Sequence, residues 1–158
     1  MAFDTITHQG EIKKFLKKQK NPDAVRLELK EFYEQTTPIH GIRVNHKFLI
    51  IDRAAFRIMN TSDILWVYHL NTKSKMYGVL TVGSFHAVVF RTSDGADNRV
   101  VVSTAKSAEE LIHYLFPILK QAFFGYNAEI VKIWNEGEKD QHMAMRILGQ
   151  MQHERKGN

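Results

Sequence analysis

The sequence predicts an α+β protein in which an antiparallel meander of short strands is closed by one amphipathic helix. Three observations lead to this fold class. Short runs of β-branched and aromatic residues follow one another over residues 42–103, with turn residues between them. A helical stripe of apolar residues follows at 108–119, and helical spacing precedes the strands at 11–35. An apolar content of 44% over 158 residues is enough to form a buried core.

Two helices are expected before the strands. In residues 11–19 the apolar side chains recur at i, i+3 and i+4, as in a short amphipathic helix; they are Ile12, Phe15 and Leu16. A second helix is expected after Asn21, which can cap it, and Pro22, which is tolerated at the first helical position. Its apolar positions are Val25, Leu29, Phe32 and Tyr33. Alternation of Val25, Leu27 and Leu29 is typical of a strand and is the alternative for this segment.

Six strands are predicted in the middle of the chain, at a spacing of about 8 to 12 residues that suits an antiparallel meander. They lie near residues 47–51, 55–59, 64–70, 77–81, 86–91 and 99–103. The clearest turn is Ser93-Asp94-Gly95, where Asp and Gly both tolerate positive φ. Polar residues continue to Asn98, so this hairpin loop is expected to be longer than two residues.

One predicted strand carries two large aromatic side chains on the same face. Trp66 and Tyr68 are two residues apart, and the same alternation places Leu65 and Val67 on the other face. We expect Trp66 and Tyr68 to pack inward because of their size. An outward-facing aromatic platform is the alternative.

The helix that closes the meander is predicted to begin at Ser107, because Glu110 three residues later completes a capping box. Pro117 lies within its apolar pattern and predicts a kink or an early end, and Gly125 is expected to be a C-cap. Two further helical pieces, 128–134 and 140–154, are separated at Gly137. The expected organisation is an N-terminal helical extension (1–40), a central domain (41–127) and a C-terminal helical tail packed on it (128–158).

These elements carry a resemblance to a known architecture over residues 42–127. Its residues are Asn45-His46-Lys47-Phe48-Leu49-Ile50, Phe56-Arg57-Ile58, Asp63-Ile64-Leu65-Trp66-Val67-Tyr68, the turn at Asp94-Gly95, the helix 108–119 and Phe124-Gly125-Tyr126-Asn127. In this pattern the chain resembles the pleckstrin-homology-like (PH-like) domains of bacteria. The resemblance implies a split antiparallel barrel of six or seven strands, capped by the helix and extended by helices at both ends.

The resemblance also implies a scaffold that binds peptides, partner domains or lipid headgroups and rarely catalyses a reaction. Lipid-binding PH-like domains place a lysine in one strand and a closely spaced basic pair in the next. The nearest match here is Lys47, Arg53 and Arg57, which lacks that pair. These three residues, with Lys73 and Lys75 in a predicted hairpin loop, are the expected contacts for a ligand or lipid.

Composition and charge exclude several classes of protein. The chain has no cysteine, which excludes disulfides and thiolate catalysis. No apolar run is long enough to span a membrane and the first residues do not form a signal peptide, so we expect a cytoplasmic protein. The net charge of +5 is spread thinly except for the five lysines of residues 13–20. These lysines either solvate a helix or contact an anionic partner.

Motifs that carry chemistry are missing from the sequence. The eight histidines include no i, i+4 pair typical of a helical metal site, and the glycines form neither a P-loop nor a nucleophile elbow. We therefore expect no enzyme activity, no cofactor and no metal. Nucleic-acid binding is not expected either, because the basic residues are not interleaved with aromatic residues on one surface.

The last segment offers an apolar stripe to a partner. Met143, Ile147 and Met151 share this stripe and suit contact with a protein partner, with a second copy or with the protein's own sheet. The sequence thus predicts a non-enzymatic binding or assembly module with an unidentified ligand. The alternative is a peripheral membrane protein that binds anionic lipid headgroups through basic loops.

Overall fold

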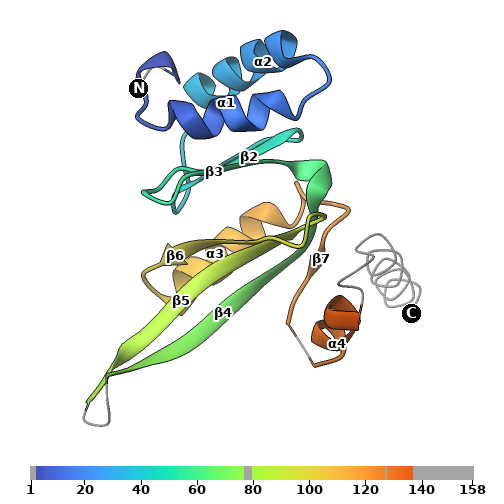
Figure 1. Cartoon of the computed structure of the whole chain (residues 1–158). Helices are drawn as coiled ribbons and strands as arrows, with labels where there is room; N and C mark the ends of the chain where they lie inside the picture. The colour runs from blue at the N-terminus through green and yellow to red at the C-terminus, as the bar shows by residue number, and fades with distance from the viewer. Residues whose placement is uncertain (1–2, 77–79, 127, 137–158) are drawn as a thin grey trace. The chain divides into compact units, whose positions relative to one another are not determined.

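The computed structural model describes residues 3–76, 80–126 and 128–136 (Figure 1). The chain divides into two compact units, an N-terminal unit, Met1–Thr61, and a C-terminal unit, Ser62–Asn158. The described residues are helical and β-stranded, which confirms the α+β class. The domain limits at 40/41 and 127/128 stay predictions.

Helices of the N-terminal unit form as their local signals indicate. A short 3-10 helix, η1 (Phe3–Thr5), is followed by α1 (Gln9–Lys17) and α2 (Pro22–Gln35). The side chain of Asn21 accepts a hydrogen bond from the amide of Ala24, and Pro22 occupies the first turn. These two residues satisfy the helix start, so the helix prediction for this segment is confirmed over the strand alternative.

A small antiparallel sheet completes the N-terminal unit. Its strands β1 (Ile42–Val44), β2 (Phe48–Ile51) and β3 (Arg57–Asn60) are arranged in the order β1-β2-β3. The side chain of Asn45 accepts hydrogen bonds from the amides of Lys47 and Phe48 and so forms the first turn. The two strands predicted here are confirmed as β2 and β3, whereas the three-residue β1 was not predicted.

The helices of this unit are held to its sheet by one apolar cluster. The helices contribute Phe3, Ile6, Ile12, Phe15, Leu16, Leu29, Phe32 and Tyr33, and the sheet region contributes Phe48, Ile50 and Phe56. The ring of Phe48 lies 6.3 Å from that of Phe15 and 5.8 Å from that of Phe32, measured between centroids. Each fully buried side chain of this size stabilises the fold by about 1.5–3 kcal/mol.

Arg43 of β1 joins the end of α2 to the sheet. Its Nε lies 2.9 Å from Oδ2 of Asp52, and its Nη1 donates hydrogen bonds to the carbonyl oxygens of Tyr33 and Thr36. The guanidinium carbon lies 4.2 Å from the centre of the Tyr33 ring. Because helix C-termini leave carbonyl groups without intrahelical partners, Arg43 serves as a tertiary cap for α2.

The C-terminal unit is built on a four-stranded sheet with the order β6-β5-β4-β7. After the 3-10 turn η2 (Thr61–Asp63), β4 (Ile64–Met76) and β5 (Leu80–Thr92) form a long hairpin, followed by β6 (Asp97–Val102). The prediction of separate strands at 77–81 and 86–91 is wrong, since residues 80–92 form one strand. A register shift between Lys73 and Lys75 replaces the predicted loop, so the ladder continues past it.

The turn between β5 and β6 is as predicted. Asp94 accepts hydrogen bonds from the hydroxyl of Thr92 (2.6 Å) and from the amide of Ala96 (3.0 Å). Gly95 adopts a φ of 81°, a conformation that favours glycine. Four residues separate the strands, which confirms a loop longer than two.

Helix α3 (Ala105–Leu115) begins earlier than expected. Its N-cap is Thr104, whose hydroxyl accepts a hydrogen bond from the amide of Ser107 at 3.0 Å. The predicted capping box of Ser107 and Glu110 is therefore wrong, because Ser107 is already the third residue of the helix. The helix ends before Pro117, which confirms the early end.

Gly125 is not a helix C-cap, contrary to the prediction. It follows β7 (Phe123–Phe124), a short strand parallel to β4 that was not predicted. The Gly125 amide donates to the carbonyl of Val67 at 3.0 Å, and its carbonyl accepts from Nε1 of Trp66 at 2.6 Å. The φ of Gly125 is 124°, a conformation that favours glycine. Helix α4 (Ala128–Glu136) confirms the helix predicted at 128–134, and the one predicted at 140–154 lies outside the described residues.

The strands of the described residues do not close into a barrel, so the predicted split barrel is not confirmed. The seven strands of the described residues belong to two separate sheets, of three and four strands, and β3 does not pair with β4 although they follow each other along the chain. The chain leaves the first sheet at η2 and starts a new one. The prediction that an amphipathic helix caps the strands is confirmed in part, because α3 packs against β4, β5 and β6 of the second sheet (Figure 1).

Candidate functional site

The basic residues predicted to contact a ligand are divided between the two units. Lys47 lies in the turn between β1 and β2, and its Nζ is 2.5 Å from Oε2 of Glu28. Arg53, in the β2–β3 turn, lies over Gly41, where an added Cβ would be 2.2 Å from its Nε. Arg57 begins β3 and is exposed.

The other two predicted basic contacts, Lys73 and Lys75, lie in β4 of the C-terminal unit. No single unit therefore holds all five residues. The predicted partner contacts Met143, Ile147 and Met151 lie outside the described residues.

An aromatic cluster lies on one face of the four-stranded sheet. Its centre is Trp66, whose ring centroid is 4.4 Å from Tyr68, 5.6 Å from Trp134 and 6.0 Å from Tyr126. Helix α4 covers part of this face with Trp134 and Ile130. Trp66 and Tyr68 are 2% and 4% exposed, which confirms inward packing over the alternative of an outward platform.

Two exposed side chains continue this face toward solvent. Tyr126 is 58% exposed and stacks on Trp66 with an interplanar angle of 13°. Val101 of β6 is 51% exposed and pairs with Ala87, which in turn pairs with Leu70 of β4. Cross-strand partners share a face, and Leu70 shares its face with Tyr68. We call this surface, with Tyr126 and Val101 at its exposed part, the aromatic face.

Charged residues of β5 and β6 lie on the same face. Asp97 binds Arg99 at 2.6 Å and lies 3.7 Å from Arg91. The hydrogen bond from Arg99 to Asp97 raises the pKa of Arg99. Arg91 lies 5.9 Å from the Trp134 ring centre, so it links the ion pairs to the aromatic cluster. The aromatic face thus combines apolar, cationic and anionic groups, a composition typical of protein contact surfaces.

A histidine pair lies on the opposite face of the sheet. Nε2 of His69 is 3.0 Å from Nδ1 of His86, and the two residues are diagonal neighbours in the β4–β5 ladder. Burial lowers the pKa of His69 and the proximity of His86 lowers it further, whereas Glu109 of α3 acts in the other direction. The sequence analysis missed this pair because its members are far apart in sequence and meet only through the register of the hairpin.

We expect the stability of the protein to fall as the pH decreases below about 6.5, the ordinary pKa of histidine. The folded-state pKa of His69 is lowered, so the unfolded chain binds more protons in this range and acid favours unfolding. Above this pH, His69 is neutral in both the folded and the unfolded chain, and this loss of stability is absent. Urea denaturation at pH values on both sides of this range measures the change. His69→Gln should reduce the dependence of the unfolding free energy on pH, and the control His113→Gln, at an exposed position, should leave it unchanged. An equal pH dependence in all three proteins would contradict this role of His69.

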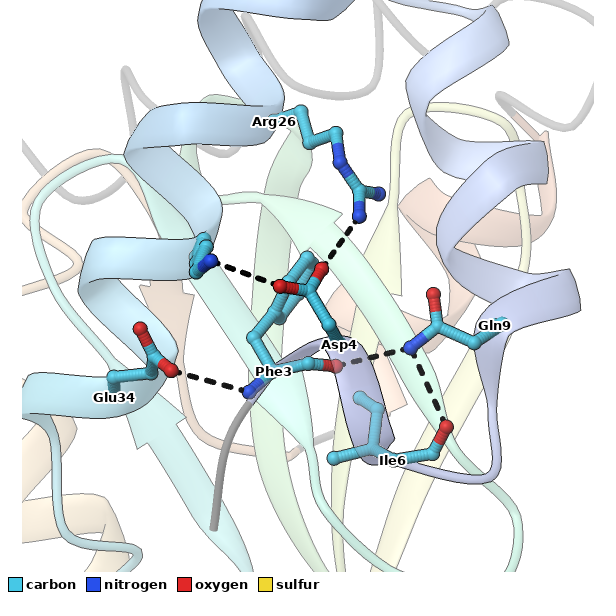
Figure 2. Close-up of polar contacts among 7 residues, drawn as sticks. Phe3, Asp4, Ile6, Gln9, Arg26 and Glu34 are labelled. Atoms are coloured by element: carbon cyan, nitrogen blue, oxygen red, sulfur yellow. Dashed lines mark hydrogen bonds and ion pairs between the residues drawn. The ribbon is translucent and has the colours of Figure 1, made fainter.

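In the N-terminal unit, acidic residues are neutralised by nearby cations. Figure 2 shows Asp4 of η1 facing Arg26 of α2, and their charged atoms are 2.7 Å apart. Lys30 lies 2.8 Å from the same carboxylate; its hydrogen bond lowers the pKa of Asp4, and the pKa of Lys30 is raised in return. A carboxylate oxygen of Glu34 accepts a hydrogen bond from the amide of Phe3. These contacts connect η1 to α2.

The lysines of α1 are not neutralised in this way. Lys13, Lys14, Lys17 and Lys18, followed by Lys20, are all exposed. The ion pairs found among residues 3–76, 80–126 and 128–136 involve none of them. Because Ile12, Phe15 and Leu16 face the core, the lysines occupy the solvent side of the helix. We call this surface the lysine face of α1.

The described segments contain neither a metal-binding cluster nor a membrane-spanning helix. There, no three His, Asp or Glu side chains come together in a way that could hold a metal ion. Within the same segments, none of the helices is both long enough and apolar enough to cross a bilayer.

The structure defines a two-unit α+β protein that presents an aromatic face on one unit and a lysine face on the other. A family model described as a domain of unknown function, DUF6709, matches residues 7–134. The chain therefore belongs to the DUF6709 family. The matched segment runs from just before α1 to Trp134 and so includes every residue of the aromatic cluster. No curated protein and no solved structure shows a significant match.

Proposed function

We propose that this protein is a non-enzymatic, cytoplasmic binding or assembly module that contacts a protein partner, or a second copy of itself, through the aromatic face. The observation that carries the proposal is the exposure of Tyr126, which is 58% accessible although it stacks on buried Trp66. Tyrosine is enriched at protein interfaces because it combines a large apolar ring with a polar hydroxyl group.

The support that Tyr126 receives makes it suited to binding. Its ring lies 5.0 Å from that of Tyr68 and 6.0 Å from that of Trp66, so its position is held before a partner arrives. A side chain that is already ordered loses little conformational entropy on binding. Val101 adds exposed apolar area on the edge strand β6, which has only β5 as a neighbour among the described strands.

We also propose that the chain has the PH-like arrangement of strands and helix that its sequence resembles. A meander of three antiparallel strands followed by an amphipathic helix, β4-β5-β6-α3, supports it. The division of the described strands into two separate sheets counts against it. The proposed contact through the aromatic face does not depend on this resemblance.

Light scattering over a range of concentrations, together with a pull-down from the host, tests the proposal. We expect either a mass above that of the monomer or a retained partner. Tyr126→Ser should reduce either signal about tenfold or more, since a central tyrosine contributes about 2 kcal/mol or more to an interface. Tyr114→Ser is the matched control, because Tyr114 is exposed on α3. A wild-type protein that is monomeric and retains no partner, or equal losses in both variants, would contradict the proposal.

The alternative was a peripheral membrane protein that binds anionic headgroups through Lys47, Arg53, Arg57, Lys73 and Lys75. Two observations weaken that choice of residues. Lys47 is paired with Glu28, and the five residues are divided between the two units. Attraction to anionic lipid is better supported at the lysine face of α1, whose cations have no ion pair among the described residues.

A further inference from the structure

We propose that the lysine face of α1 binds reversibly to the anionic leaflet of a membrane. The proposal rests on Lys13, Lys14 and Lys17 of α1, on Lys18 at its C-cap and on Lys20 two residues further on. It is independent of the proposed assembly function, which uses the other unit.

The distribution of charge within the N-terminal unit supports an anionic partner. Three other cations of this unit are paired with acidic groups: Arg26 and Lys30 with Asp4, and Lys47 with Glu28. The lysine face, in contrast, contains at least four adjacent cations without an ion pair among the described residues. Four like charges on two helical turns repel one another by a few tenths of a kcal/mol per pair, and an anionic surface removes this repulsion.

The shape of the lysine face favours a flat and diffuse anion. With about 100° between successive residues, the pairs Lys13/Lys17 and Lys14/Lys18 form two adjacent rows that cover the solvent side of α1. The resulting surface is convex, and its cations are lysines on flexible stems. Bidentate recognition of a single phosphate or carboxylate uses the planar fork of arginine, and α1 contains no arginine.

The apolar residues of α1 determine the mode of binding. Ile12, Phe15 and Leu16 are at most 9% exposed and pack in the core of the unit, so they cannot insert into a bilayer while the unit is folded. Attraction is then purely electrostatic and sensitive to salt. Phe15 is also unable to stack on a nucleic-acid base, which favours a membrane over single-stranded nucleic acid.

Vesicle co-sedimentation of the full chain tests the proposal. The probes are phosphatidylcholine vesicles in which a third of the lipid is phosphatidylserine, and vesicles of phosphatidylcholine alone. We expect binding only to the first, at low salt, and loss of binding at high salt. Lys14→Gln with Lys18→Gln should weaken the partition constant about thirtyfold, because each lysine near a charged bilayer contributes about fivefold.

The matched control is Lys106→Gln with Lys120→Gln, which removes two exposed lysines from the C-terminal unit and gives the same net charge. Circular dichroism confirms that both double variants fold. No sedimentation of the wild type with phosphatidylserine vesicles, or an equal loss in the control, would overturn the proposal. Tighter binding to polyglutamate or to duplex DNA than to these vesicles would also overturn it. The oligomeric mass measured without lipid tests the assembly function separately.

Discussion

Trp66→Ala should lower the free energy of unfolding by about 3–5 kcal/mol, the range measured when a large buried aromatic side chain is truncated. Trp66 is 2% exposed and contacts aromatic rings from β4, from the segment after β7 and from α4. Its removal leaves a cavity between these elements. It also leaves the carbonyl oxygen of Gly125 without the hydrogen bond from Nε1 of Trp66.

Urea denaturation followed by far-ultraviolet circular dichroism measures this loss. Trp66→Phe should cost less than Trp66→Ala, because it retains most of the ring packing and removes only the indole N–H and part of the volume. Val101→Ala, on the same face but 51% exposed, should change stability by less than about 0.5 kcal/mol. A loss below about 1 kcal/mol for Trp66→Ala would show that the aromatic cluster does not hold the unit together.

Arg43→Met is expected to have the second largest effect, a loss of about 2–4 kcal/mol. The side chain of Arg43 is 12% exposed and that of Asp52 is 25% exposed, so their ion pair is mostly removed from water. Without the guanidinium, Asp52 keeps a partly buried charge, and the carbonyl groups of Tyr33 and Thr36 lose a donor. Leaving such groups unpaired costs more than the net contribution of the bonds themselves.

Arg26→Met is the matched control, because Arg26 also pairs with an aspartate but is 40% exposed. Exposed ion pairs of this kind contribute little to stability, because water and salt screen them. The comparison uses urea denaturation at neutral pH, and a double-mutant cycle with Asp52→Asn isolates the pair itself. Equal losses for Arg43→Met and Arg26→Met would contradict the role of Arg43 as a cap for α2.

Features that depend on a few neighbouring residues could be predicted from the sequence. The start of α2 follows from Asn21 and Pro22, whose capping chemistry is complete within four residues. The turn at Asp94-Gly95 and the end of α3 before Pro117 are equally local. The burial of Trp66 and Tyr68 followed from strand alternation and side-chain size.

Features that depend on pairing between distant segments could not be predicted. Thr104 caps α3 instead of the predicted Ser107, because β6 ends at Val102 and the helix begins soon after it. The parallel strand β7 exists only because Phe123 and Phe124 pair with Trp66 and Val67. Closure of a barrel likewise depends on whether β3 and β4 pair, which no local pattern reveals.

The candidate sites also differ in whether they could be predicted from the sequence. The lysine face of α1 is visible in the sequence as a run of lysines, and the structure adds that these side chains have no ion pair among the described residues. The aromatic face and the histidine pair need the register of β4 against β5, which brings His69 next to His86. The predicted basic contacts came from the resemblance to PH-like domains and from a predicted hairpin loop, and the structure assigns them to two different units.

The placement of Trp66 and Trp134 in one cluster has a spectroscopic consequence. The chain contains only these two tryptophans, and their rings are 5.6 Å apart. All indole fluorescence of the protein therefore originates from one location, and the emission of each ring is sensitive to the presence of the other. Intrinsic emission will report the opening of the C-terminal unit, while the N-terminal unit, which contains no tryptophan, contributes no indole signal of its own.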